Sequence, residues 1–158
     1  YQKGSWILHM LRSQVGNEAF WAGIRLYYAR YMNANATTAD FRAAMEEASG
    51  IDLEDFFQQW LYSGGNPRLE GWWDYDSTAR AVRIEINQTQ NAGPTFAFPI
   101  EIGLYFESGA ETSVVESVSV DARFHRFVIP VENEPAEVTL DPNVKTLFQA
   151  DFGHRNGG

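Results

Sequence analysis

The feature that most constrains this chain is a change in the spacing of its apolar residues at Gly64-Gly65-Asn66-Pro67. Before this point apolar residues recur every three or four positions, which is typical of amphipathic helices. After it they alternate with polar residues, which is typical of strands with one buried face. Because glycine and proline in succession end helical structure, we expect two units with a boundary near Asn66.

The first unit, residues 1–66, is predicted to be all-α, with four helices that pack as antiparallel neighbours because their connections are short. Gly16 is expected to end the first helix in a left-handed conformation, and Asn17 to cap the second. Thr37 and Asp40 fit the capping-box pattern of the third helix, and Asp52 is expected to cap the fourth. The four apolar stripes are Ile7, Met10, Leu11 and Val15, then Phe20, Ile24, Tyr27, Tyr28 and Tyr31, then Phe41, Ala44, Met45 and Ala48, then Leu53, Phe56, Phe57, Trp60 and Leu61.

The second unit, residues 67–152, is predicted to be an antiparallel, immunoglobulin-like β-sandwich, so the fold class is α+β in separate units. Its first two strands are expected to form a hairpin through residues 76–80. A closed barrel is the alternative arrangement of the same strands. Residues 153–158 are predicted to be a flexible tail. The predicted strands cover residues 69–75, 82–86, 100–106, 113–120, 124–131, 137–140 and, as a further candidate, 146–152.

Charge and composition narrow the class of partner. The 158 residues include 12 basic and 21 acidic side chains, a formal net charge of −9, and the lysines are Lys3 and Lys145. Because phosphate binding needs a clustered basic surface, nucleic acid is not an expected partner. No apolar run approaches the roughly 20 residues that cross a bilayer, so we expect a soluble chain without a membrane span.

The acidic residues are distributed unevenly along the chain. Residues 1–66 hold five basic and seven acidic side chains, net −2, whereas residues 67–158 hold seven and fourteen, net −7. We interpret this as a solubilising acidic surface, and a docking site for basic ligands is the alternative. The lack of cysteine excludes disulfides and a cysteine nucleophile, and leaves the cellular compartment open. The sequence opens at Tyr1 with neither a methionine nor a charged and apolar leader, so we expect it to be part of a longer polypeptide.

The individual residues do not predict an active site. The histidines, His9, His125 and His154, are predicted to lie on a helix, a strand and the tail, and no zinc-binding spacing joins them. Ser5 lacks the strained turn or the neighbouring base that a nucleophilic serine needs. Carboxylate pairs such as Glu46 with Glu47 and Asp74 with Asp76 belong by local pattern to a surface helix and a turn, and nothing in the sequence places them in an apolar pocket that would raise a carboxyl pKa.

Read as a string, however, the first half of the chain resembles a known family. Its opening segment, Tyr1-Gln2-Lys3-Gly4, resembles the Y-x-K-G segment of gluzincin aminopeptidases, zinc metallopeptidases related to aminopeptidase N. The similarity continues through residues 16–20, 37–41, 56–61 and 64–67. It covers the β unit more loosely, at Gln88-Thr89-Gln90 and Leu140-Asp141-Pro142.

This resemblance implies a hydrolase that removes amino-terminal residues from peptides, and a catalytic role for Tyr1. In such enzymes two histidines of H-E-x-x-H and a more distant glutamate hold zinc, so the zinc ligands are expected outside this chain. Tyr1 matches the tyrosine that donates a hydrogen bond to the oxygen that becomes an oxyanion. A phenol with a pKa near 10 stays protonated at neutral pH and can donate to developing negative charge. Tyr1 is therefore the one predicted catalytic residue, and no residue here is predicted to bind metal or cofactor.

The resemblance also implies how the chain relates to the rest of such an enzyme. Residues 1–66 would be the helical C-terminal part of the catalytic domain, with Lys3 as a first-turn charge and Gly4 at a close backbone approach. Because the zinc motif would precede Tyr1, the 158 residues alone are expected to be inactive. The expected partner of these residues is the N-terminal part of the catalytic domain, which they do not include. Its absence would expose apolar surface around Trp6, Leu11 and Phe20. The alternative function is a non-catalytic module that binds proteins or peptides.

Overall fold

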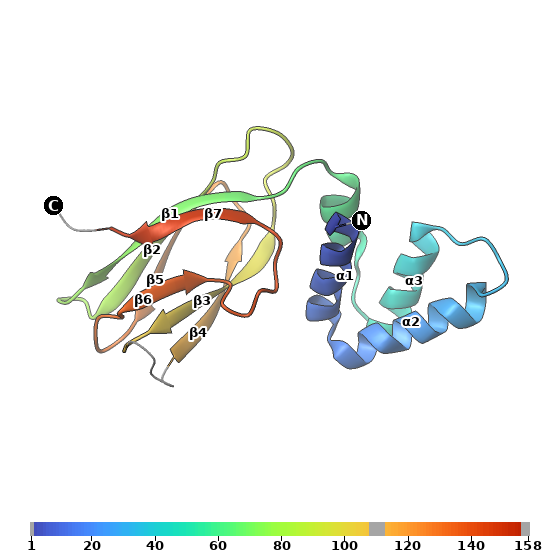
Figure 1. Cartoon of the computed structure of the whole chain (residues 1–158), viewed down its shortest axis with the longest axis horizontal. Helices are drawn as coiled ribbons and strands as arrows, with labels where there is room; N and C mark the ends of the chain where they lie inside the picture. Colours follow the sequence, from blue (N-terminus) through green and yellow to red (C-terminus); the bar gives the residue numbers. More distant parts are fainter. Residues whose placement is uncertain (1, 108–112, 156–158) are drawn as a thin grey trace. The chain divides into compact units, whose positions relative to one another are not determined.

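The computed structural model describes residues 2–107 and 113–155, which fall in two compact units, Tyr1–Gly64 and Gly65–Gly158 (Figure 1). In the described residues every helix belongs to the first unit and every strand to the second. The predicted fold class, α+β in separate units, is confirmed. None of the helices in the described part of the chain has the length and apolar character needed to span a membrane.

The helical unit consists, in its described residues, of the four predicted helices. They are α1 (Gln2–Val15), α2 (Asn17–Tyr31), α3 (Thr38–Ser49) and α4 (Glu54–Phe57), and α4 continues without a break into a π-helical turn, η1 (Gln58–Tyr62). Helix α2 packs along α3, and α1 packs against both α2 and η1. The fully buried side chains at the centre of this unit include Leu11, Met45 and Leu53.

Of the three predicted side-chain caps, one is present and two are wrong. Thr37 and Asp40 form the capping box of α3, with Thr37 N–H donating to Asp40 Oδ2 at 2.8 Å. Asp52 does not cap α4, because Leu53 occupies the capping position, and Asp52 Oδ1 accepts from the Glu54 N–H in the turn that leads into the helix. Asn17 does not cap α2, because a single residue, Gly16 at φ +85°, separates α1 from α2 and takes the capping position itself. The Asn17 side chain instead accepts a hydrogen bond from Arg12 Nε at 2.9 Å.

Of the three residues around which an exposed apolar surface was predicted, Trp6 is partly exposed, whereas Leu11 and Phe20 are buried. Leu11 is completely buried and Phe20 is 7% exposed, since both lie on the faces of α1 and α2 that pack within this unit. Tyr28, which was predicted to belong to the buried stripe of α2, is 64% exposed. The large apolar side chains that this unit does expose are Leu8, Trp21, Tyr28, Met32, Ile51, Leu61 and Tyr62.

The β unit forms two sheets in its described residues, as expected for a sandwich and not for a closed barrel. One sheet has the order β5-β2-β1-β7, with β1 (Arg68–Asp76), β2 (Ala81–Gln88), β5 (Phe124–Pro130) and β7 (Gln149–His154). The other has the order β4-β3-β6, with β3 (Phe98–Tyr105), β4 (Ser113–Val120) and β6 (Glu137–Leu140). Side chains that alternate along β2 and β3 form the core between the sheets: Val82, Ile84, Ile86, Phe98, Ile100, Ile102 and Leu104.

The last strand departs from the prediction in its bounds and direction. The predicted flexible tail begins at Gly153, but β7 continues through His154 because its backbone pairs with Trp72 and Trp73 of β1. The Arg155 N–H then donates to the Trp73 carbonyl oxygen, and the Arg155 guanidinium lies 4.4 Å from the centre of the Trp72 ring. This pairing is parallel, unlike the antiparallel pairs elsewhere in the described sheets.

Candidate functional site

The predicted catalytic residue, Tyr1, lies outside the described residues, so the site is built from the segment that follows it. Helix α1 begins at Gln2, and its first turn therefore contains the rest of the Tyr1-Gln2-Lys3-Gly4 motif. Farther along α1, Ile7 and Leu11 are buried and attach the helix to its unit. The candidate site is thus the amino-terminal end of a helix whose core-facing side is well packed.

Lys3 is half-buried and makes a long-range contact from this first turn. Its Nζ donates to the backbone carbonyl oxygen of Ser63, the residue that follows η1, at 3.4 Å. The sequence motif singled out Lys3 only as a first-turn charge, and its partner near residue 63 could not be inferred from spacing. In Figure 1 the start of α1 lies beside the end of the α4 and η1 helix, in agreement with this contact.

Gly4 does not have the close backbone contact that was predicted for it. A Cβ built at this position would meet no described atom within 4 Å, and Gly4 is exposed. Within the described chain, therefore, packing does not require glycine at this position.

The three histidines have separate structural surroundings. His9 is exposed on α1 and its ring packs edge-on against Trp6. His125 Nε2 accepts hydrogen bonds from the backbone N–H groups of Asp121 and Ala122, at 3.0 and 2.9 Å, and so holds the turn between β4 and β5. His154 lies on β7 against the Trp73 ring. Among the described residues no group of three or more His, Asp or Glu side chains could hold a metal ion.

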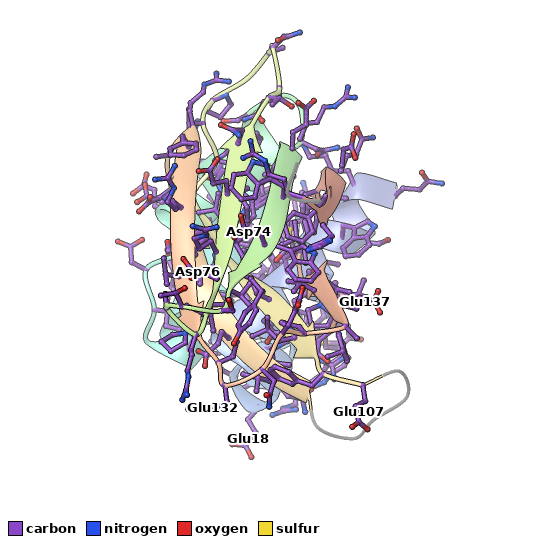
Figure 2. All side chains as sticks on the ribbon, turned by 90° about the vertical axis from the view of Figure 1, so that its left-hand side faces the viewer. Glu18, Asp74, Asp76, Glu107, Glu132 and Glu137 are labelled. Atoms are coloured by element: carbon purple, nitrogen blue, oxygen red, sulfur yellow. The ribbon has the colours of Figure 1, made fainter. Side chains whose placement is uncertain are left out.

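Several acidic side chains of the β unit are partnered by arginines. Of the acidic residues labelled in Figure 2, Asp74 on β1 is bound by Arg83 at 2.6 and 3.0 Å, and Glu132, just after β5, is bound by Arg80 at 3.0 Å. The backbone N–H groups of residues 79 and 78, and the Arg83 charge, hold the pKa of Asp76 below its usual range. Asp76 is therefore stabilised in the ionised form, which suits turn structure and not general-acid catalysis.

The loosely matching glutamine motif of the β unit has a structural explanation. Gln88 and Gln90 are buried polar residues, and Gln90 Nε2 donates to Gln88 Oε1 at 2.9 Å. Gln88 Oε1 also accepts from the Phe96 N–H at 3.0 Å, and its Nε2 donates to the Phe96 and Ala122 carbonyl oxygens at 2.7 and 3.1 Å. The motif therefore fixes the loop after β2 against the turn before β5.

Asp141, in the second loosely matching motif, has a comparable role. It is buried at φ +52°, and its carboxylate accepts from the backbone N–H groups of Lys145 and Thr146 at 2.9 and 2.8 Å. Aspartate tolerates this left-handed backbone better than most residues, and its oxygens satisfy the N–H groups of the turn. Both motifs of the β unit thus stabilise connections between strands.

Known proteins are similar to this chain over the segment that contains the candidate site. Residues 1–60 match the model of the peptidase family M1 domain. Aminopeptidase N of Escherichia coli is 33% identical over 115 residues, which cover 69% of this chain and 13% of that protein. Glutamyl aminopeptidase of Homo sapiens is 41% identical over 69 residues, which cover 44% of this chain and 7% of that protein.

A solved structure supports the fold over nearly the whole chain. The crystal structure of Legionella pneumophila aminopeptidase A in complex with aspartic acid matches with a TM-score of 0.76 and 22% identity, and the match covers 96% of this chain and 17% of that one. The match to the family model and the similarity to the aminopeptidases N assign the chain to the M1 peptidase family. The chain spans about an eighth of the length of the bacterial aminopeptidases N that it resembles, since the matches cover 13% of them.

Proposed function

We propose that this chain is part of a zinc-dependent aminopeptidase that removes amino-terminal residues from peptides. The observation that carries the proposal is the match of residues 1–60 to the M1 domain, a match that begins at Tyr1. In this proposal Tyr1 donates a hydrogen bond to the carbonyl oxygen of the scissile peptide bond as negative charge develops on it. Comparable oxyanion donors contribute about 3 kcal/mol to transition-state stabilisation.

In this proposal the zinc ligands lie outside the 158 residues, as the resemblance to enzymes with an H-E-x-x-H motif implies. When bound, zinc would supply Lewis-acid polarisation of the scissile carbonyl. The 158 residues alone are then expected to show no peptidase activity. Stoichiometric zinc and turnover in the isolated chain would contradict this part of the proposal.

We further propose that residues 1–66 are the helical C-terminal part of the catalytic domain, and that residues 67–152 are the β-sandwich domain that follows it. The large apolar side chains that the helical unit exposes support this assignment, because the part of a domain that packs against missing segments carries apolar residues on that surface. The partner that would cover them is the N-terminal part of the same domain. The β unit has its own core between two sheets, as expected for a separate domain.

The test of the catalytic proposal is Tyr1→Phe in the complete protein. Loss of one oxyanion donor is expected to lower kcat by about 100- to 1,000-fold, with a smaller change in KM and unchanged zinc content. Tyr62→Phe is the matched control, because Tyr62 is an exposed phenol on η1 of the same unit and should leave kcat unchanged. Full turnover by Tyr1→Phe would refute the role of Tyr1. A complete protein without zinc or peptidase activity that still binds peptides would instead favour a binding module.

A further inference from the structure

The turn between β4 and β5 brings three groups to one ring nitrogen. The Nε2 atom of His125 accepts hydrogen bonds from the backbone N–H groups of Asp121 and Ala122, at 3.0 and 2.9 Å. The same nitrogen lies 3.2 Å from Oδ1 of the Asp121 carboxylate. An N–H group donates a hydrogen bond and a carboxylate accepts one, so the two kinds of partner require different protonation states of His125.

Neutral His125 binds the backbone N–H groups, and charged His125 binds the carboxylate. Nε2 accepts a hydrogen bond only when it carries no proton, and the proton of the neutral ring is then on Nδ1. In the imidazolium both ring nitrogens are donors, so Nε2 loses the Asp121 and Ala122 N–H groups and can donate to Asp121 Oδ1 instead. Histidine is the side chain that ordinarily changes its charge between pH 5 and 8. One proton therefore exchanges one set of partners for the other.

The surroundings of the ring permit this exchange without loss of the fold. The His125 ring stacks on the Phe127 ring, with centroids 5.3 Å apart and an interplanar angle of 5°, and an aromatic face also accommodates a cation. Asp121 and Ala122 are exposed, so water can bind their N–H groups after release. The side chain of His125 is 18% exposed, which gives a proton access to it.

The charged side chains of the neighbouring strand lie on the other face of the sheet. His125 pairs with Ile86 of β2, and side chains alternate between the two faces along each strand. Glu85 of β2 is therefore on the opposite face, where its carboxylate binds Arg126. Arg83 lies on that face as well, two residues before Glu85. None of these three charges faces the His125 ring.

Two further charged residues belong to the strand and turn before β5. The Arg123 guanidinium donates to the carbonyl oxygens of Gln88 and Gln90, at 3.4 and 3.1 Å. Glu116 lies on β4, four residues before Val120 and so about 13 Å from it along the strand. In the part of the chain that the structure describes, the charge placed at the ring is thus that of the Asp121 carboxylate.

The turn is also connected to the buried glutamine of β2. The Gln88 side chain donates to the Ala122 carbonyl oxygen at 3.1 Å, and the Gln88 N–H donates to the Arg123 carbonyl oxygen at 2.8 Å. The same side chain binds the N–H and carbonyl groups of Phe96 at the end of the loop after β2. A change in the position of residues 121–122 therefore reaches this loop through Gln88.

We propose that the β4–β5 turn is a proton-sensitive switch. Neutral His125 holds the N–H groups of Asp121 and Ala122, whereas charged His125 releases them and pairs with the Asp121 carboxylate. The release weakens the contact of the turn with Gln88 and so loosens residues 89–95. This inference goes beyond the proposed peptidase function and does not depend on it, because its residues all belong to the β unit.

The experiment is an NMR titration of the 158-residue chain between pH 5 and 8. As the ring gains its proton, the amide proton signals of Asp121 and Ala122 should move upfield, with the same midpoint as the His125 ring signals. His125→Gln has no group that titrates in this range and should abolish the movement. His9→Gln is the matched control, because it removes an exposed histidine of the helical unit and should leave the movement unchanged.

A second substitution tests the partner of the charged state. Asp121→Asn keeps the backbone N–H but removes the charge that pairs with the imidazolium, so the transition should move to lower pH by about half a unit, as for an exposed ion pair. Asp151→Asn, at an exposed carboxylate of β7, is the control and should not move it. An unchanged transition in Asp121→Asn would overturn the role of this carboxylate.

The unmodified chain alone can overturn the inference, even if a variant does not fold. Amide signals of residues 121 and 122 that stay constant while the ring titrates would do so, and so would amide and ring midpoints that differ. A movement that persists in His125→Gln would also overturn it. In the complete protein, hydrogen exchange of residues 119–125, corrected for the intrinsic pH dependence, should show severalfold lower protection at about pH 5.5 than at about pH 7.5. Equal protection at the two pH values would reject the switch there.

Discussion

At the scale of single residues, the buried Gln88 shows how a polar side chain can stabilise a connection inside an apolar core. It is 3% exposed, and both atoms of its amide group are used by hydrogen bonds to Phe96, Ala122 and Gln90. A buried amide is costly unless its donors and acceptors are satisfied, and here both are. The loop that reaches Phe96 therefore depends on one side chain of β2.

Replacing this amide should destabilise the β unit. Gln88→Leu keeps a similar side-chain volume but removes the buried hydrogen bonds to the Phe96 N–H and to the Phe96 and Ala122 carbonyl oxygens, so we expect a loss of about 1–3 kcal/mol in the free energy of unfolding. Urea unfolding followed by circular dichroism measures it. Gln149→Leu, on the exposed surface of β7, is the matched control and should change stability by less than about 0.5 kcal/mol. Equal effects of the two substitutions would mean that the buried network contributes nothing specific.

The sequence placed Gln88 correctly near the end of a strand but could not predict its partners. Its acceptors lie eight and 34 residues away, at Phe96 and Ala122, and strand periodicity carries no information about such distances. The same limit applies to Lys3, whose acceptor is 60 residues away. Local patterns identified both motifs, whereas their hydrogen-bond partners follow only from the folded chain.

At the scale of elements, α2 and α3 approach each other closely at Gly23. A Cβ at this position would lie 2.5 Å from Met45 Sδ and 3.3 Å from the Met45 Cα, so the absence of a side chain permits the contact. Met45 is fully buried and is one of the core residues of the unit. A single glycine thus sets the separation of the two helices.

Gly23→Ala should therefore destabilise the helical unit although alanine favours helices. Alanine in a helix is worth about 0.5–1 kcal/mol over glycine, but forcing a methyl group into a packed contact costs about 1–3 kcal/mol, so we expect a net loss of stability. Gly4→Ala is the control, since its Cβ would meet no described atom within 4 Å and the substitution should be neutral or stabilising. Thermal unfolding of both variants measures the difference. A more stable Gly23→Ala protein would show that the helices can separate at little cost.

Helices and strands were predictable where the pattern is local. The capping box of Thr37 and Asp40 and the alternation in β2 and β3 each lie within a few residues, and the structure contains them. The cap predicted at Asn17 failed because the one-residue connection leaves Gly16 in that position. The predicted end of the last strand was wrong because β7 pairs with β1, and this pairing joins segments that are far apart in the sequence.

At the scale of the whole chain, the exposed apolar side chains of the helical unit lie on faces that do not contribute to its core. Trp21, Tyr28 and Met32 follow one another at spacings of seven and four, which places them on one side of α2 and its end. The core-facing residues of the same helix, Phe20 and Gly23, lie on the other side. Helix α2 thus has two apolar faces, only one of which is covered in the described unit.

The isolated 158-residue chain should therefore bind a hydrophobic dye through this surface. Replacing both Tyr28 and Met32 by lysine is expected to reduce dye fluorescence severalfold without lowering stability, because both side chains are mostly exposed. Val128→Lys, at an exposed position of β5, is the control and should change the signal little. If the unmodified chain binds no dye, the exposed face is too small or too interrupted to act as an uncovered interface.

The parallel pairing of β1 with β7 has a consequence for how this protein is made. The two strands are the first and last of their unit, and about 80 residues separate Arg68 from its partner Gln149. At a synthesis rate of about 5–20 residues per second, this edge of β1 waits roughly 4–16 seconds after translation of β1 before its partner exists. During that time the nascent sheet can gain β2 and β5 on one side only, so the opposite border is the one that a chaperone or a neighbouring nascent chain can reach.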